Sequence, residues 1–168
     1  MPGRPTLAAI SSLASTSFSG TVFRVVPDKL RRRVLSTEGN RYYSGRYHIA
    51  GETGILYTSL GEDVALRELA RHAARATLQG GLATGRIKVR LQRVLDLTDE
   101  GNLRKLGVSR EDLTSPNYAL TQAISMHVRT VGFQGILVPS AAGDGKNLVV
   151  FENNLAEGCS FDVEQIRG

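Results

Sequence analysis

Five polar side chains at the edges of apolar segments have types and positions that suit chemistry. They are Arg24, Arg46, Tyr57, Glu68 and Ser140. A guanidinium group binds phosphate oxygens through paired, charge-assisted hydrogen bonds, and a fixed carboxylate stabilises positive charge that develops near it. Each residue also has an ordinary explanation: a solvated arginine, a core tyrosine, a weakly ion-paired surface glutamate or a serine that caps a turn. Taken singly, none of the five identifies a function.

Glu68 is the most unusual of the five because of its neighbours. It lies in the stretch GILYTSLGEDVALRELARHA, residues 54–73, where Arg67 and Arg71 follow one another at helical spacing, and Arg75 continues that spacing just beyond the stretch. The apolar residues of this segment fall on the opposite side of the helix, and Glu68 lies at the border between the two sides. Nearby guanidinium groups favour the charged form of a carboxyl group. We therefore expect Glu68 to be ionised at neutral pH.

Positive charge is concentrated in the first part of the chain. The net charge of the 168 residues is +5, but residues 1–48 alone hold a balance of +6, so that the remaining 120 residues sum to −1. A cationic segment implies an anionic partner, which could be nucleic acid, an acidic protein tail or the phosphates of a small ligand. A solvated basic surface is the alternative interpretation of the run KLRRR at 29–33.

Several classes of protein are disfavoured by what the sequence lacks. It has no phosphate-binding GxxxxGK[ST] loop, no GxGxxG after a strand, no HExxH and no GxSxG. One cysteine and three scattered histidines give no ligand spacing for zinc. No stretch approaches 18 unbroken apolar residues, and the N-terminal segment lacks the features of a secretory signal. We expect a soluble cytoplasmic protein that uses no metal.

The elements that must position the polar residues are a mixture of strands and helices. Apolar alternation and β-branched runs predict strands over 21–26, 54–59, 85–97, 133–140 and 147–151. Helical periodicity predicts helices over 60–78, 99–106 and 116–131, with a further short helix capped by Ser109. Ser59 and Glu62 are expected to form a capping box, AAGDGK to form a hairpin turn, and residues 28–50 to form a long loop or short irregular strands. The irregular order predicts a mixed α+β fold.

Four segments together resemble a known family. They are FRV at 23–25, SGRYH at 44–48, GILYTSLGEDVALRE at 54–68 and GILVPSAAGDGKNLVVF at 135–151. In order and spacing they resemble the RES domain, named for its arginine, glutamate and serine, over roughly residues 21–152. The resemblance implies an α+β fold similar to ADP-ribosyltransferases, with mixed and antiparallel sheets and flanking helices. It places the domain at 21–168, after a leader at 1–20 that is expected to be partly disordered.

The resemblance also implies the chemistry. RES proteins degrade NAD, in which nicotinamide is already a cationic leaving group, so one carboxylate suffices where ordinary glycosidases use two. The catalytic residues implied are Glu68, Arg46, Tyr57 and Ser140. The NAD-binding residues implied are Arg24, Arg46, Tyr47, Tyr57 and Ser140. The arginines would hold the pyrophosphate, Tyr57 would stack on the nicotinamide ring or wall its pocket, and Ser140 would contact the ligand or orient Glu68.

The same resemblance implies partners, and three alternatives stay open. RES proteins are the toxins of RES/Xre toxin–antitoxin pairs, so it implies NAD cleavage with water or phosphate as acceptor, an Xre-type antitoxin and a homodimer. Transfer of ADP-ribose from NAD to a protein stays open, as does a basic nucleic-acid-binding module at 29–33, which ranks lower. The family usually has GGRWN where this chain has SGRYH, so a relative that keeps the fold without activity is a third alternative. Membrane binding and direct contact with nucleic acid are not expected.

Overall fold

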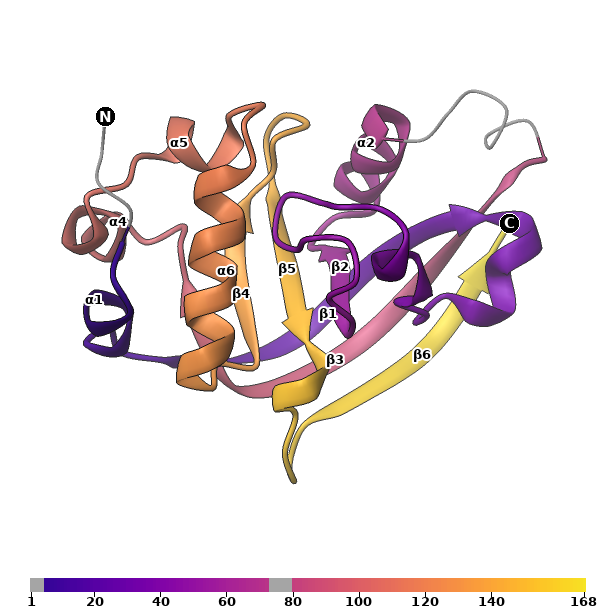
Figure 1. Ribbon diagram of the computed structural model, residues 1–168. Helices are drawn as coiled ribbons and strands as arrows, with labels where there is room; N and C mark the ends of the chain where they lie inside the picture. The colour runs from indigo at the N-terminus through magenta and orange to yellow at the C-terminus, as the bar shows by residue number, and fades with distance from the viewer. Residues whose placement is uncertain (1–4, 73–79) are drawn as a thin grey trace.

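The structure, a computed structural model, describes residues 5–72 and 80–168, which form one mixed sheet with helices packed against it (Figure 1). The strands are β1 Thr16–Pro27, β2 Ile55–Ser59, β3 Leu82–Asp96, β4 Gly135–Pro139, β5 Lys146–Phe151 and β6 Ser160–Arg167. They follow the order β1-β2-β5-β4-β3-β6, and β1 also pairs with β3. All neighbours are antiparallel except β3 and β4, which are parallel.

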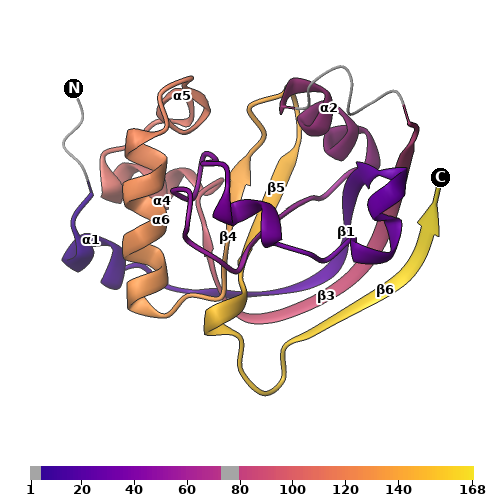
Figure 2. The ribbon, with the colours of Figure 1, turned by 45° about the vertical axis from the view of Figure 1, so that its right-hand side comes forward.

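The pairing of β1 with β3 bends the sheet back on itself. These two long strands run side by side from Thr16 opposite Val94 to Pro27 opposite Leu82. At the other edge of β1, a single register pair joins Phe23 to Ser59 of β2. The strands β1, β2, β5, β4 and β3 therefore form a closed path, and β6 lies outside it along β3. Figure 2 shows the long strands curving together and β6 at the outer edge.

Side chains alternate between the two faces of the sheet along the short central strands, and so they contribute to two separate apolar clusters. Ile55 of β2 packs with α6 in the larger apolar cluster, whereas the next residue, Leu56, packs with β1 and β3 in the second cluster. Because successive strand side chains point to opposite faces, Tyr57 lies on the same face as Ile55. It stands opposite Val149 of β5, a residue of the larger cluster. The register therefore directs Tyr57 toward the helical side of the sheet.

The helices lie in two separate places. Their bounds are α1 Leu7–Ser11, α2 Glu62–His72, α4 Glu100–Leu106, α5 Arg110–Thr114 and α6 Ala119–Val131, with 3-10 turns at Asp28–Arg33, Glu38–Arg41 and Glu152–Asn154. In Figures 1 and 2, α1, α4, α5 and α6 gather at one end of the sheet and α2 stands at the other. Among the described residues, no helix has the length and apolar character needed to cross a bilayer.

Most of the predicted elements are confirmed, with shifted ends. Ser109 caps α5, where a reciprocal capping box joins it to Asp112, and Gly132 ends α6 in the left-handed conformation at φ 102°. The strands at 133–140 and 147–151 form the predicted hairpin of β4 and β5. The helix predicted at 60–78 begins at Glu62 and is described as far as His72. Residues 73–78 of that prediction, Arg75 among them, lie outside the described residues.

Other predictions differ from the structure. Ser59 was expected to cap α2, but it ends β2 and its hydroxyl donates to Asn147 Oδ1 at 2.7 Å. The first strand begins at Thr16 instead of residue 21, because β1 stays paired with β3 over the whole length. Within the segment expected to be a leader, Ile10 and Leu13 are buried in the larger cluster. Residues 28–50 form a long loop with two short 3-10 turns, which confirms the first of the two predicted alternatives, whereas β6 was not predicted.

Candidate active site

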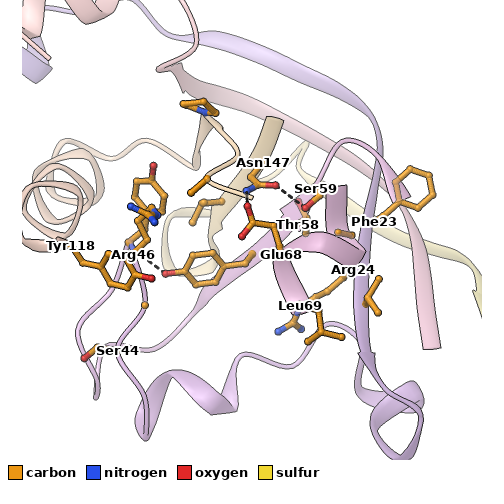
Figure 3. Close-up of a pocket in the computed structure, with 18 residues that line it drawn as sticks. Phe23, Arg24, Ser44, Arg46, Thr58, Ser59, Glu68, Leu69, Tyr118 and Asn147 are labelled. Carbon is orange, nitrogen blue, oxygen red and sulfur yellow. Dashed lines mark hydrogen bonds between the residues drawn. The ribbon is translucent and has the colours of Figure 1, made fainter. Parts of the chain in front are cut away.

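A cavity of about 320 Å³ lies between α2, β2 and the turn at residues 44–47, and it gathers most of the predicted site residues. Arg24, Arg46, Tyr47, Tyr57 and Glu68 all line it. In Figure 3, Arg46 lies to one side of Glu68 and Arg24 to the other. The volume falls within the range of small-molecule sites. Ser140 is not among the residues that line the cavity, but its neighbours Pro139 and Ala141 are.

The Glu68 carboxylate is held by two hydrogen bonds to one oxygen. Ser140 Oγ donates to Glu68 Oε1 at 2.6 Å, and Asn147 Nδ2 donates to the same atom at 2.9 Å. Both donors are themselves fixed, because Ser140 Oγ accepts from the Ala142 N–H at 3.1 Å and Asn147 Oδ1 accepts from Ser59 Oγ. Of the two roles predicted for Ser140, contact with the ligand and orientation of Glu68, the geometry provides the second. The carboxylate therefore has a defined orientation at the cavity wall.

The arginines beside Glu68 fasten helix α2 to the β4–β5 loop. Arg67 Nη2 donates to the carbonyl oxygen of Asp144 at 2.5 Å, and Arg71 Nη1 donates to the carbonyl oxygen of Ala141. Arg67 also pairs with Asp63, one turn earlier in α2, at 3.0 Å. Because the loop follows Ser140 directly, these bonds hold Ser140 against the helix that carries Glu68. The arginine spacing in the sequence thus serves a contact between two elements.

Arg46 is anchored from the helical side of the cavity. It is 9% exposed, and its Nη1 donates to the carbonyl oxygens of Leu113 at 3.1 Å and Ser115 at 2.5 Å. Its guanidinium group lies over the Tyr118 ring, 4.5 Å from the ring centroid. Arg46 Nη2 has no hydrogen-bond partner among the residues that the structure describes. A buried donor without a partner is costly, so this nitrogen is suited to an anionic oxygen of a ligand.

Arg24 is anchored from the opposite side. Its Nη1 donates to the carbonyl oxygens of Val34 and Ser36, each at 2.7 Å. Burial lowers the pKa of the Arg24 guanidinium to about 10, and the Glu152 carboxylate partly offsets this effect. A group with that pKa keeps its charge at neutral pH. The cavity therefore has a fixed cation on each side of its carboxylate.

Tyr57 is fixed through its hydroxyl group. The Tyr47 backbone N–H donates to Tyr57 Oη at 3.0 Å, and His48 Nδ1 lies 2.6 Å from the same oxygen. Burial raises the pKa of the Tyr57 phenol, which stays neutral throughout the physiological range. Burial likewise raises the pKa of the Tyr47 phenol, whose oxygen has no hydrogen-bond partner in the described part of the chain. Both tyrosines thus present uncharged rings to the cavity.

Three contributors were missed by the sequence analysis. Asn147 holds Glu68, Tyr118 supports the Arg46 guanidinium, and His48 contacts the Tyr57 hydroxyl. Asn147 lies in NLVVF, which was considered only as a strand, and Tyr118 lies just before a predicted helix. His48 ends the segment SGRYH, where the departure from the family pattern drew attention to the position and gave no role for it.

The arrangement suits cleavage of a phosphate-containing substrate that develops positive charge. Two arginines can hold negative phosphates, and an oriented carboxylate can face an electron-poor carbon. Among residues 5–72 and 80–168, no three His, Cys, Asp or Glu side chains are grouped so as to hold a metal ion.

Comparison with known proteins identifies the family. The model of the RES domain matches residues 21–165, most of the chain. The chain belongs to the RES domain family. The resemblance given by the four sequence segments is therefore confirmed, and the matched range extends beyond residue 152 to include most of β6.

Two relatives of this RES domain protein are mycobacterial proteins. It is 38% identical over 151 residues to the protein named probable NAD(+) phosphorylase Rv3189 of Mycobacterium tuberculosis, a match that covers 88% of this chain and 71% of the relative. It is 25% identical over 155 residues to NAD(+) phosphorylase MbcT of Mycobacterium bovis, and this match covers 89% of this chain and 82% of the relative. A crystal structure of the M. tuberculosis MbcT–MbcA toxin–antitoxin complex matches with a TM-score of 0.79 at 23% identity, over 96% of this chain and 90% of the other. The α+β fold is thus that of a known RES protein.

Proposed function

We propose that this protein is a RES-type toxin that consumes NAD by cleaving the bond between nicotinamide and ribose. The observation that carries the proposal is the Glu68 carboxylate, held by Ser140 and Asn147 in a cavity that Arg24 and Arg46 also line. Relatives at 38% and 25% identity bear the name NAD(+) phosphorylase, which supports the same substrate here. The catalytic residues proposed are Glu68, Arg46 and Tyr57, and Ser140 is proposed as the residue that positions Glu68.

The reaction needs one fixed negative charge. When the bond from ribose C1′ to the nicotinamide nitrogen breaks, its electron pair neutralises the pyridinium ring, and positive charge develops at C1′. Glu68 is placed to stabilise that charge more strongly in the transition state than in bound NAD. An oxygen of the acceptor then bonds to C1′, and the proton of that acceptor passes to solvent.

The other site residues bind and orient NAD. Arg24 and Arg46 hold the pyrophosphate, and Arg46 does so through Nη2, the donor for which the described residues provide no partner. Tyr47 and Tyr57 wall the pocket of the nicotinamide ring with uncharged aromatic surface. Ser140 acts through Glu68, to which it donates.

Phosphate is the acceptor that the names of the relatives favour. Attack by phosphate on C1′ gives a phosphorylated ADP-ribose, attack by water gives ADP-ribose, and transfer to a protein gives a modified side chain. Incubating the purified protein with NAD, with and without phosphate, and measuring nicotinamide and the ADP-ribose product separates the three. Release of nicotinamide that depends on phosphate is the expected result, and the absence of any nicotinamide release would overturn the proposal.

A partner and a compartment complete the proposal. The structural neighbour was solved as a toxin–antitoxin complex. We infer a cognate antitoxin of the Xre type that covers the NAD cavity, and action in the cytoplasm, where the NAD pool is. Self-association as a homodimer is proposed from the family alone. Co-expression with the cognate antitoxin should remove NAD loss, and size-exclusion chromatography measures the oligomeric state.

A further inference from the structure

The hydrogen-bond partners of His48 show which of its two ring nitrogens carries the proton. Its Nε2 is 2.7 Å from the carbonyl oxygen of Tyr43, and its Nδ1 is 2.6 Å from Tyr57 Oη. A carbonyl oxygen only accepts, so Nε2 carries the proton. In a neutral ring Nδ1 is then an acceptor, and the Tyr57 hydroxyl donates to it. Tyr57 Oη in turn accepts from the Tyr47 N–H.

The surroundings favour the neutral ring. His48 is 5% exposed, and burial lowers the pKa of its imidazole. The charged groups that face it are Glu52 from its own loop, which raises the pKa, and Arg129 from α6, which lowers it. These two form an ion pair at 2.7 Å, so their opposite effects partly cancel. The hydrogen bond to the Tyr43 carbonyl oxygen also raises the pKa of His48, but burial is the largest cause and the net shift is downward.

The turn around His48 is built to bring the two rings together. A Cβ atom added to Gly45 would lie 2.6 Å from His48 Cε1 and 2.7 Å from Tyr57 Oη, so a glycine is needed there. Helix α6 holds the turn in place: Gln122 Nε2 donates to the carbonyl oxygens of Gly45 at 3.0 Å and His48 at 3.2 Å. The same turn carries Arg46 into the cavity. His48 therefore links β2 to the turn that presents Arg46.

We propose that His48 is a positioning residue for NAD cleavage: its neutral ring holds the Tyr57 hydroxyl through Nδ1 and so fixes the Tyr57 ring at the cavity wall. The inference rests on the proposed function. It also implies that the Tyr57 hydroxyl proton is committed to His48 and is not available to the substrate. When His48 gains a proton, Nδ1 becomes a donor and the hydrogen bond must reverse, so the Tyr57 hydroxyl group keeps its proton but points it away from His48. We therefore expect kcat to fall as the pH drops and His48 becomes protonated, which gives the pH profile of kcat an acid limb.

Two substitutions at position 48 separate the two ring nitrogens. In His48→Asn the amide oxygen takes the place of Nδ1 and cannot be protonated, whereas in His48→Gln the amide reaches the place of Nε2 and leaves Tyr57 without its acceptor. We expect His48→Asn to keep kcat within about threefold and to lose the acid limb of the kcat profile. We expect His48→Gln to lower kcat roughly tenfold, the size associated with one buried hydrogen bond. His127→Asn, a substitution of a histidine that does not line the cavity, should keep the acid limb.

A double-mutant cycle and a spectrum complete the test. In a Tyr57→Phe background the Asn and Gln variants at position 48 should have the same kcat, because the Tyr57 hydroxyl that only the Asn variant can hold is gone. The ¹⁵N spectrum of the His48 imidazole should show a neutral ring protonated at Nε2 at pH 7, whether or not the protein is active. An Nδ1-protonated or charged ring, or equal kcat in the Asn and Gln variants with both folded, would overturn the inference. Absence of nicotinamide release by the wild type would instead overturn the proposed function, and the spectrum would still decide the hydrogen bond.

Discussion

Removing the Ser140 hydroxyl tests how firmly Glu68 must be held. In Ser140→Ala the Glu68 carboxylate loses the shorter of the two hydrogen bonds that Ser140 and Asn147 donate to Oε1, at 2.6 Å, and keeps the one from Asn147 at 2.9 Å. A hydrogen bond to a charged group contributes about 1.5–3 kcal/mol, which corresponds to roughly 10- to 150-fold in rate if all of it is used in the transition state. Because Asn147 remains, we expect a fall in kcat near the lower end, about tenfold.

The assay is nicotinamide release at saturating NAD, with KM measured in parallel. The hydroxyl acts on Glu68 and does not line the cavity, so kcat should fall while KM stays within about twofold. Ser125→Ala is the matched control, because Ser125 is buried in α6 and its Oγ has no partner among the described residues. A Ser140→Ala protein that is folded and as active as the control would refute the reasoning, since orientation of Glu68 by Ser140 would then not matter.

Three further predictions follow from contacts around the cavity. Arg46→Ala should raise KM for NAD at least tenfold, and an unchanged KM would count against a pyrophosphate contact. Arg67→Ala should lower kcat several-fold and speed proteolysis of the β4–β5 loop, because the bond to the Asp144 carbonyl is lost; unchanged kcat and cleavage would show that the loop holds without it. The unfolding free energy should fall as the pH drops below about 6.5, because the unfolded chain protonates His48 more readily than the folded one, whose pKa is lowered. Chemical denaturation measures this, and the unfolding free energy of His48→Asn should depend less on pH than that of the wild type.

The sequence predicted local structure well because its signals were local. Ser109 lies three residues before Asp112, and together they form the capping box that starts α5. In β3, the alternating residues Ile87, Val89 and Leu91 are all buried, as the period of two requires. Gly132 ends α6 because its left-handed φ disfavours any other residue. None of these features depends on residues far along the chain.

The site was predicted only as far as the family resemblance reached. The resemblance predicted that Arg24, Arg46 and Glu68 share one site. In the structure all three line one cavity, although they lie on a strand, a turn and a helix. The resemblance could not indicate which residues hold these side chains in place. Glu68 meets Ser140 across 72 residues and Asn147 across 79, and such contacts leave no periodic signal in one sequence. The predicted capping role of Ser59 was wrong for the same reason, since a distant residue, Asn147, offered its hydroxyl a partner.

The most direct test of the central claim is nicotinamide release by Glu68→Gln. Glutamine keeps an oxygen that accepts from Ser140 and Asn147, so the variant should fold and bind NAD with a dissociation constant within about threefold of the wild type. Without the negative charge, kcat should fall by roughly two to three orders of magnitude, comparable to the loss of a preorganised electrostatic group in other enzymes. Nicotinamide release near the wild-type rate by this variant would contradict the account.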